Sequence, residues 1–288
     1  MTTIGIIGGS GVYELDGLEN IQEHTVETPF GAPSDAVITG ELEGTQLIFI
    51  PRHGRGHRLL PSEVPFRANI FALKQMGAQM VVSVSAVGSM KENIVPGHFV
   101  IPNQYIDRTM GRQQTFFGNG IVAHVSAANP ICPHLASHLA DSIAACDVHF
   151  HKSGTYICME GPAFSTRGES LMYRQWGVDI IGMTAMPEAK LAREAELHYA
   201  TLALVTDYDC WYEGHDDVSV EAVIETLNKN TSNVKKVLGH ALPQLGKKME
   251  GVECECASAL QFAIMTDPAL IPEERKEALK PIIGKYLS

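Results

Sequence analysis

The chain has 288 residues, of which 45% are hydrophobic and 19% are charged, and its formal net charge is −11 at pH 7. This composition argues against a disordered protein, and the acidic excess disfavours a nucleic-acid or membrane-surface partner, because phosphate-rich surfaces attract basic proteins. No run of about 18 uncharged apolar residues occurs and the first residues do not resemble a signal peptide, so we expect a cytoplasmic protein.

Short runs of β-branched residues alternate with longer amphipathic stretches along the chain, which is typical of an α/β domain. No linker or repeat divides the chain, so we predict a single domain over residues 1–288, with a central mixed, twisted, partly barrel-like sheet flanked by helices. Ligands of such sheets bind at the carboxyl ends of strands, so polar residues that follow strands are the candidates for function. The expected strands are 3–7, 46–50, 80–87, 99–101, 155–159 and 201–206, and the expected helices are 65–76, 166–176, 186–196, 219–242 (stopped by Pro243) and 273–280.

A glycine-rich turn, GGSG at residues 8–11, follows the first expected strand. Glycines let backbone N–H groups turn toward an anion, and the hydroxyl of Ser10 would add a further donor. The pattern matches neither the dinucleotide fingerprint nor the Walker A loop. A cradle for a single phosphate is one interpretation, and an ordinary tight turn is the other.

The next two expected strands also end in groups that suit phosphate. The strand at 46–50 runs into PRHGRGHR, where the guanidinium of Arg52 offers a planar fork of donors and His53 stands beside it. The strand at 80–87 contains Ser85 and Ala86, whose hydroxyl and N–H could complete the pocket. A solvated basic loop and close strand packing are the alternative interpretations.

Phe164 and Ser165 lie in EGPAFS, which joins an expected strand to a helix with a capping box. The ring of Phe164 could stack on a planar ligand, or it could be an ordinary core residue.

The last long strand ends in Asp207 and Asp209, whose side chains point to the same side of an extended chain. Neighbouring carboxylates repel, so the pKa of one rises and that group can hold a proton near neutral pH, as a general acid needs. A metal pair and a surface turn are the rival interpretations, although a divalent metal would need more oxygen ligands than this segment has.

Six cysteines are present, without a CxxC pair and without structural-zinc spacing, so we expect no metal site and mostly buried free thiols. Cys254 and Cys256 form a CxC pair that could be a local disulfide or a redox pair.

These parts together suit an attack of phosphate on a heterocyclic glycoside. The chain moreover resembles the methylthioadenosine phosphorylases of the trimeric purine nucleoside phosphorylase superfamily. The resemblance extends from Ile4 to about Leu242, and the part from about residue 251, which we expect to be helical, matches less clearly. The segments that carry it are GIIGGSG, TPFGAPSD, PRHGRGH, SAVGS, PGHFVIPNQYIDRT, EGPAFSTRGES, GMTAMPEAKLARE and TDYDCW.

The resemblance implies a nucleoside-phosphorylase fold and the conversion of 5′-methylthioadenosine and phosphate to adenine and 5-methylthioribose 1-phosphate, in purine and methionine salvage. It implies no cofactor, with phosphate as co-substrate, and a homotrimer. Asp207 would face N7 of the base and Asp209 its exocyclic amine. Phosphate would contact Ser10, Arg52, His53, Ser85, the Ala86 N–H and Thr184; the nucleoside would contact Phe164, Ser165, Met183, Val220 and Val223, with His124 reaching the methylthio pocket from a neighbouring subunit.

Three alternatives remain beside this reading. A 6-oxopurine or methylthioinosine phosphorylase of the same fold is disfavoured by Asp207 and Asp209, because the resemblance implies asparagine at position 207 in such enzymes and a carboxylate repels a 6-carbonyl. A nucleosidase that uses water would not need PRHGRGH. A silent nucleotide-binding protein would not need the complete catalytic set.

Overall fold

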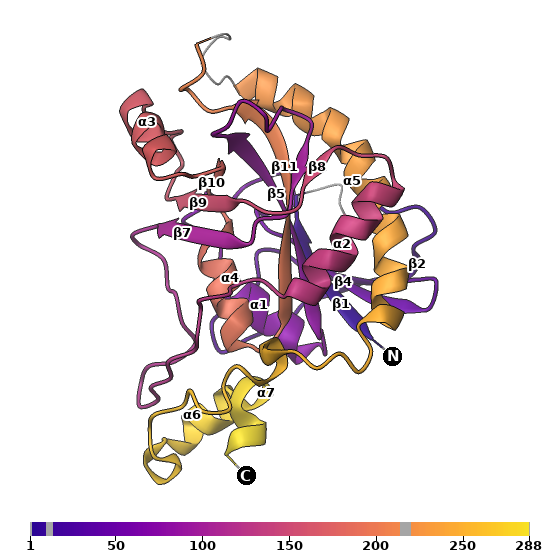
Figure 1. Cartoon of the computed structure of the whole chain (residues 1–288). Helices are drawn as coiled ribbons and strands as arrows, with labels where there is room; N and C mark the ends of the chain where they lie inside the picture. The colour runs from indigo at the N-terminus through magenta and orange to yellow at the C-terminus, as the bar shows by residue number, and fades with distance from the viewer. Residues whose placement is uncertain (1, 10–13, 214–219, 288) are drawn as a thin grey trace.

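The computed structural model describes residues 2–9, 14–213 and 220–287, and the side chains of residues 220–225, 227 and 229 lie outside the described part. Strands and helices alternate along most of this length (Figure 1). The strands are β1 (Thr3–Gly8), β2 (Glu19–His24), β3 (Val37–Leu42), β4 (Thr45–Pro51), β5 (Met80–Ser89), β6 (Phe99–Val100), β7 (Gln104–Arg108), β8 (Phe150–His151), β9 (Thr155–Met159), β10 (Ile180–Gly182) and β11 (His198–Tyr208). The helices are α1 (Phe66–Gln75), α2 (Pro133–Ala145), α3 (Arg167–Gln175), α4 (Ala185–Glu194), α5 (Val220–Lys248), α6 (Glu273–Ala278) and α7 (Lys280–Ile283), with 3-10 turns η1 (Glu255–Ser258), η2 (Pro268–Leu270) and η3 (Gly284–Tyr286).

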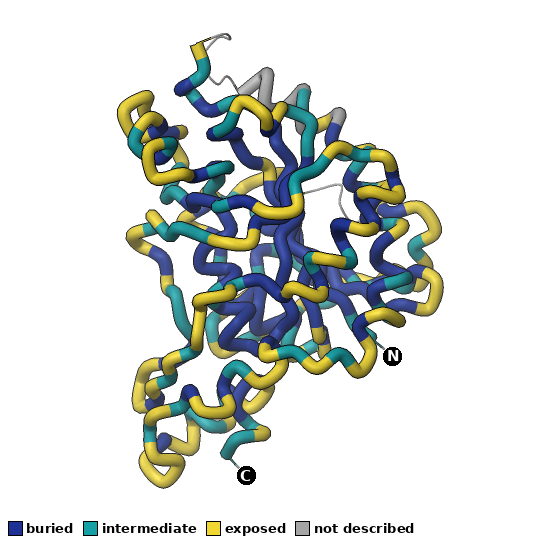
Figure 2. Tube along the Cα trace, viewed as in Figure 1, coloured by how far each residue is buried: buried dark blue, intermediate teal, exposed yellow. Residues whose placement is uncertain are grey.

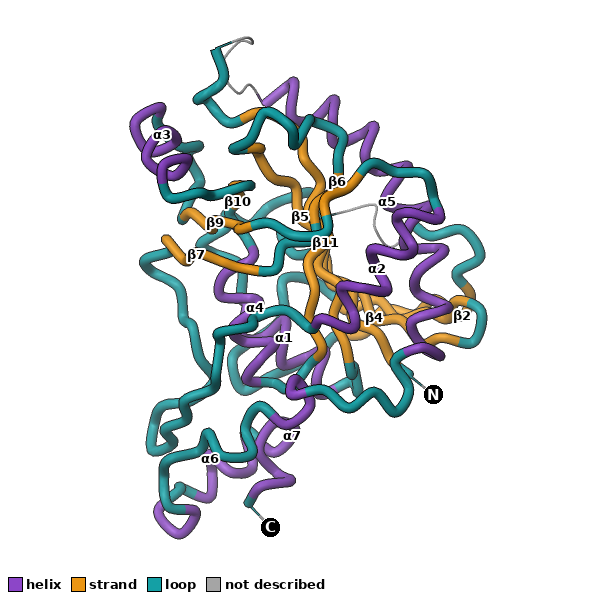
Figure 3. The backbone as a smooth tube through the Cα atoms, viewed as in Figure 1, coloured by secondary structure: helices purple, strands orange, loops and turns teal. Residues whose placement is uncertain are grey.

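The described strands form one mixed sheet that branches at β5. Its main path is β2-β3-β4-β1-β5-β10-β9-β7, and β11 pairs with β5 and with β6, which in turn pairs with β8. β5 and β11 are nearly all buried because their residues are apolar or small on both faces, as in a sheet covered by helices on both sides. Figure 3 shows α2 and α5 on one side of β11 and α1 and α4 on the other. The fold is therefore the mixed α/β architecture with flanking helices that the sequence predicts.

The buried residues concentrate along β1, β5 and β11, whereas the C-terminal segment at the bottom of the molecule is largely exposed (Figure 2). The described part contains no helix that is long and apolar enough to cross a membrane.

All six expected strands are present, and β2, β3, β7, β8 and β10 are additional. β2 is polar and exposed along most of its length, and β8 and β10 have only two and three residues. These strands therefore lack the hydrophobic pattern by which a strand is predicted from sequence. The expected helices 65–76, 166–176 and 186–196 correspond to α1, α3 and α4, and α3 has the predicted capping box at Thr166 and Glu169. α2 was not expected from the sequence.

Two predicted helix ends are wrong, and both involve proline. α5 continues through Pro243 to Lys248, because Leu242, Leu245 and Met249 on both sides of the proline are buried against the core and tertiary packing outweighs the lost hydrogen bond. At the C-terminus the expected helix 273–280 is divided into α6 and α7, with Pro281 in the first turn of α7, a position that tolerates proline.

Candidate active site

The site begins with a gap along one edge of β5. β11 pairs with one edge of β5 from Met80 to Ser89, so β1 and β10 share the other edge. Among the residues that the structure describes, β1 pairs only as far as Ser83 and β10 begins its pairing at Gly88, which leaves residues 84–87 between them without a strand partner on that edge. Ala86 is exposed there although it lies in a strand that is otherwise buried. The gap makes the backbone of β5 accessible to a ligand.

Arg52 follows β4 and is held rigidly below this gap. Its Nε donates to Glu188 Oε2 at 2.8 Å, its Nη2 to Glu188 Oε1 at 3.1 Å and Ser83 Oγ at 2.7 Å, and its Nη1 to the Val84 carbonyl at 2.8 Å. Arg52 and Glu188 are 3% and 1% exposed, so this is a buried, bidentate ion pair. One N–H of Nη1 keeps no acceptor among the described residues and is free for an anion.

His53 stands next to Arg52 on the same loop. Its Nδ1 lies 2.8 Å from the Leu59 carbonyl, which can only accept, so Nδ1 carries the hydrogen and Nε2 is the free ring atom. Its ring stacks on His57 with the centroids 4.3 Å apart. Burial lowers the pKa of His53 to about 4. His53 is therefore neutral at pH 7 and offers Nε2 as a hydrogen-bond acceptor.

Two hydroxyl groups lie together at the gap. Ser85 Oγ is 3.0 Å from Thr184 Oγ1 and 3.3 Å from the hydroxyl of Tyr156. Thr184 is the N-cap residue of α4, yet its side chain makes no capping bond, so its hydroxyl is directed to Ser85 instead. Gly182 is required at this point, because a Cβ atom there would collide with the Tyr156 hydroxyl.

The loop before α4, which carries Met183 and Thr184, is held by Arg112. Nη1 of Arg112 donates to the carbonyls of Met183 and Met186, both at 2.7 Å, and Nη2 donates to the carbonyl of Glu160, also at 2.7 Å. Its Nε forms an ion pair with the Glu160 carboxylate at 3.1 Å. Arg112 thus joins the loop that precedes α4 to the loop that follows β9.

The two carboxylates lie at the end of β11, beside the same gap. A bulge between Val205 and Asp207 shifts the register of β11 on β5, so that Asp207 pairs with Gly88. A Cβ atom on Gly88 would lie 3.0 Å from Asp207 Oδ1 and 3.6 Å from the Asp209 Cβ, so both side chains pack over this glycine. The predicted carboxylate pair therefore exists, and a side chain at position 88 would crowd it.

Asp207 and Asp209 have different partners. Asp207 Oδ2 accepts from the Thr206 hydroxyl at 2.6 Å, while both oxygens of Asp209 lie within 2.8 Å of Ser165 Oγ. Burial and, to a smaller extent, the charge of Asp209 raise the pKa of Asp207 to about 6, against the lowering effect of the Thr206 hydroxyl. Asp207 can therefore hold a proton close to neutral pH.

The remaining residues that the sequence analysis assigned to the site do not all lie at the gap in β5. Phe164 is 47% exposed, so it is not a core residue, and Met183 packs against Gly161 near the site. His124 is exposed, and its N–H donates to the Ala263 carbonyl. The chain around it therefore lies against the C-terminal segment, far from the end of β11 in Figure 1. Ser10 and the side chains of Val220 and Val223 lie outside the described residues.

Glu188, Arg112 and Tyr156 are buried residues of this site that had no role in the sequence analysis. Glu188 neutralises Arg52, and Arg112 anchors the loops at Met183 and Glu160. Both residues are distant in the sequence from the groups they contact. A buried arginine predicts that some carboxylate lies beside it, but nothing local indicates Glu188, which is 136 residues away from Arg52.

Comparison with known proteins identifies the family. Residues 3–243 match the phosphorylase superfamily. S-methyl-5′-thioadenosine phosphorylase from Geobacter sulfurreducens is 56% identical over 285 residues, which cover 99% of each chain. The crystal structure of a methylthioadenosine phosphorylase from an antarctic soil metagenomic library superposes with a TM-score of 0.93 at 48% identity, covering 98% of each chain.

A mutant of adenosine/methylthioadenosine phosphorylase from Schistosoma mansoni, in complex with methylthioadenosine, is 35% identical with a TM-score of 0.83, covering 91% of this chain and 99% of that one. This chain is thus similar to these proteins in both sequence and structure over nearly its whole length. The chain belongs to the phosphorylase superfamily, and it is a phosphorylase, an enzyme of the pentosyltransferase type.

Proposed function

We propose that this phosphorylase cleaves 5′-methylthioadenosine with inorganic phosphate, releasing adenine and 5-methylthioribose 1-phosphate. The observation that carries the proposal is the placement of a donor-rich gap in β5 next to the Asp207–Asp209 pair: one end suits an oxyanion and the other suits an adenine edge. The names of the relatives support the choice of substrate. The products place the reaction in purine and methionine salvage.

Phosphate binds in the gap along β5. The hydroxyls of Ser85 and Thr184, the N–H of Ala86 and the free N–H of Arg52 are its donors, with Ser10 as a further one. Because Glu188 neutralises Arg52, attraction of the dianion depends on these oriented dipoles as much as on net charge. Neutral His53 accepts a hydrogen bond from the protonated oxygen of HPO₄²⁻. Glu188 acts as a positioning residue, since it orients the guanidinium.

The glycosidic bond breaks ahead of full phosphate attack, through an oxocarbenium-like state. The bound dianion stabilises the positive ribosyl group. Protonated Asp207 donates to N7 of the leaving base, which departs as neutral adenine; general-acid assistance of this kind contributes about 10²–10⁴-fold. Asp209, held by Ser165, accepts from the exocyclic amine. A 6-carbonyl would meet a second acceptor there, which disfavours 6-oxopurines.

The other predicted contacts complete the substrate site. Phe164 covers the base. Its side chain is partly exposed in the single chain, and a bound ligand or a neighbouring subunit would cover it. Met183 lines the ribose, and Val220 and Val223 line the methylthio group, where apolar side chains favour a thioether over a hydroxyl. We propose a homotrimer in which His124 of a neighbouring subunit closes this pocket. No cofactor takes part in the reaction we propose.

The test is release of adenine from 5′-methylthioadenosine by the purified enzyme, with and without phosphate, and with methylthioinosine and adenosine as parallel substrates. We expect release that requires phosphate and that is fastest with methylthioadenosine. Release without phosphate would show a nucleosidase and remove the role given to Arg52. Preference for methylthioinosine would keep the phosphate site and contradict the role given to Asp209.

A further inference from the structure

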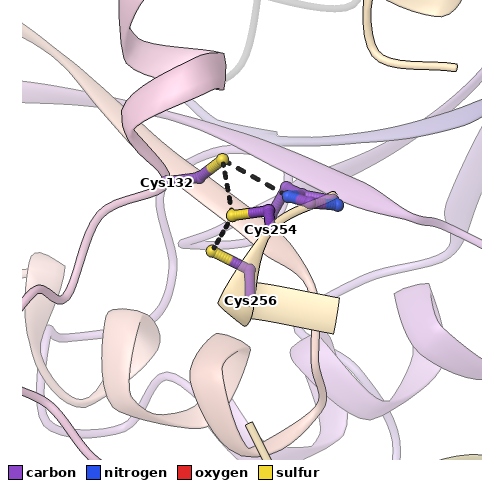
Figure 4. A group of neighbouring side chains, drawn as sticks. Cys132, Cys254 and Cys256 are labelled. Carbon is purple, nitrogen blue, oxygen red and sulfur yellow. Dashed lines mark hydrogen bonds between the residues drawn. The ribbon is translucent and has the colours of Figure 1, made fainter. Parts of the chain in front are cut away.

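Four side chains that the reaction does not use meet in one cluster, far from the carboxylate pair. They are Cys132, the N-cap residue of α2; His198, the first residue of β11; and Cys254 and Cys256, at η1. One ligand atom from each of them lies within 4.8 Å of all the others. Figure 4 shows the three sulfur atoms directed toward one another. Three separate parts of the fold thus present soft donor atoms to one point.

The distances within the cluster are those of a compact ligand set. Cys132 Sγ lies 3.9 Å from Cys254 Sγ and 3.3 Å from His198 Nδ1, and Cys254 Sγ lies 3.2 Å from Cys256 Sγ. A tetrahedral zinc ion with Zn–S of 2.3 Å and Zn–N of 2.0–2.1 Å separates its sulfur ligands by about 3.8 Å and sulfur from nitrogen by about 3.6 Å. The observed separations scatter around these values, so small side-chain rotations produce the full geometry.

A buried positive charge lies directly against the cluster. Arg193 is 7% exposed and donates from Nη1 to Cys256 Sγ at 3.3 Å and from Nε to the Ser126 carbonyl. Among the residues that the structure describes, no carboxylate forms an ion pair with it. A buried guanidinium without a counter-ion is costly. The N–H of Leu135, in the first turn of α2, also points to Cys132 Sγ at 3.5 Å.

We propose that Cys132, His198, Cys254 and Cys256 bind a structural zinc ion. Three thiolates, one imidazole and Zn²⁺ carry a net charge of −1, which Arg193 neutralises. Cys132, His198 and Cys256 are buried and all four positions are taken by protein atoms, as in a closed structural site rather than a catalytic one. Through Cys254 and Cys256, the ion attaches the segment after α5 to Cys132 at the start of α2 and to His198 at the start of β11. That segment lies beyond residue 243, where the match to the phosphorylase superfamily ends.

The first test is the zinc content of the full chain, purified without a histidine tag and without chelator, measured by inductively coupled plasma mass spectrometry. We expect about one zinc per chain in the parent protein, and less than a tenth of that in Cys256→Ser. The matched control is Cys146→Ser, since Cys146 is also buried, but its sulfur donates to the Lys236 carbonyl and is not part of the ligand cluster. The control should retain the full zinc content.

A second measurement covers the case in which Cys256→Ser folds poorly. The parent protein and His198→Cys, both stripped of metal and reloaded with Co²⁺, should show the absorption of tetrahedral cobalt with thiolate ligands. The sulfur-to-cobalt charge-transfer band should be stronger in His198→Cys, which supplies a fourth thiolate. Chelation should also speed cleavage by trypsin after Lys247 or Lys248, next to the fastened segment.

Two outcomes would overturn the proposal. One is parent protein that, fully reduced and incubated with ZnCl₂ before gel filtration, holds no more zinc than Cys256→Ser. The other is a disulfide among Cys132, Cys254 and Cys256 in protein isolated without oxygen, detected by mass after alkylation without reduction, because a disulfide removes two of the four ligands.

Discussion

At the scale of single residues, identical side chains differ in function because of what surrounds them. Asp207 and Asp209 both follow the buried part of β11. Asp207 has one short bond, from the neighbouring Thr206, and its burial raises its pKa to about 6. Both oxygens of Asp209 are engaged by Ser165. The first is thus suited to give a proton, and the second to accept hydrogen bonds.

Replacing Asp207 with asparagine should lower kcat for methylthioadenosine by about 10²–10⁴-fold and change KM for phosphate little, because only proton donation is lost. The pKa of Asp207 is raised, so its proton is fully present well below pH 6 and is lost as the pH rises through about 6. The ratio of parent to variant kcat/KM should therefore fall as the pH rises from 5.5 to 8. Comparing the two proteins at each pH cancels the ionisation of phosphate.

The matched control is Asp141→Asn on the exposed surface of α2, which should leave the pH profile unchanged. A ratio that is constant with pH, or a variant that turns over as fast as the parent, would contradict the role given to Asp207.

At the scale of elements, the site depends on how closely three strands approach. β9 and β10 run parallel, and β10 meets β5 at Gly88 and Ser89. The hydroxyl of Tyr156 in β9 reaches Ser85 in β5 across Gly182 of β10. The small residue in β10 therefore lets a side chain of one strand support the hydroxyl pair of another.

Replacing Gly182 with alanine should destabilise the protein by about 1–3 kcal/mol, because the added methyl group collides with Tyr156 in a packed core. The same change should lower activity, since Ser85 loses its support. Gly168→Ala in the first turn of α3 is the control: a Cβ atom there meets nothing within 4 Å, and alanine favours a helix. Urea unfolding measures both variants, and equal stability in the two would show that the contact is not tight.

At the scale of the whole molecule, the C-terminal segment is attached to the core at several points. Glu196, just before β11, accepts from the Leu260 N–H at 2.9 Å and from the hydroxyl of Tyr286, and forms an ion pair with Lys285 at 2.6 Å. The loop that carries His124 packs on this same segment through the Ala263 carbonyl. His124 is therefore placed by the C-terminal part of its own chain, and its distance from the carboxylates fits a role in a neighbouring subunit.

Mixing two defective proteins tests that role. His124→Ala should raise KM for methylthioadenosine several-fold, and Asp207→Asn should be nearly inactive. If His124 serves a neighbour, trimers reassembled from both chains contain some sites with both native residues, so activity exceeds that of the two separate proteins. If His124 serves its own chain, every mixed site has one defect and no activity is recovered. Light scattering should give three chains per particle, and a monomer would exclude the arrangement.

The sequence by itself determined most of the strands that carry the site, although not β10, and the polar residues that follow them. Alternation, β-branched runs and strand ends are local properties, so Arg52, Ser85, Asp207 and Asp209 could be identified without a structure. The Cys254–Cys256 pair could be recognised in the sequence for the same reason. Its neighbours in the fold, Cys132 and His198, could not.

Only the tertiary structure decided what those residues meet. The gap in β5 exists because β1 ends and β10 begins at different points of one edge. Glu188 lies beside Arg52, and His198 beside Cys132, through pairings between residues 136 and 66 positions apart. Such contacts depend on the order and register of the strands, which short-range patterns do not encode. The fold therefore supplies the counter-charges, the access and the shared ligand cluster that single segments cannot specify.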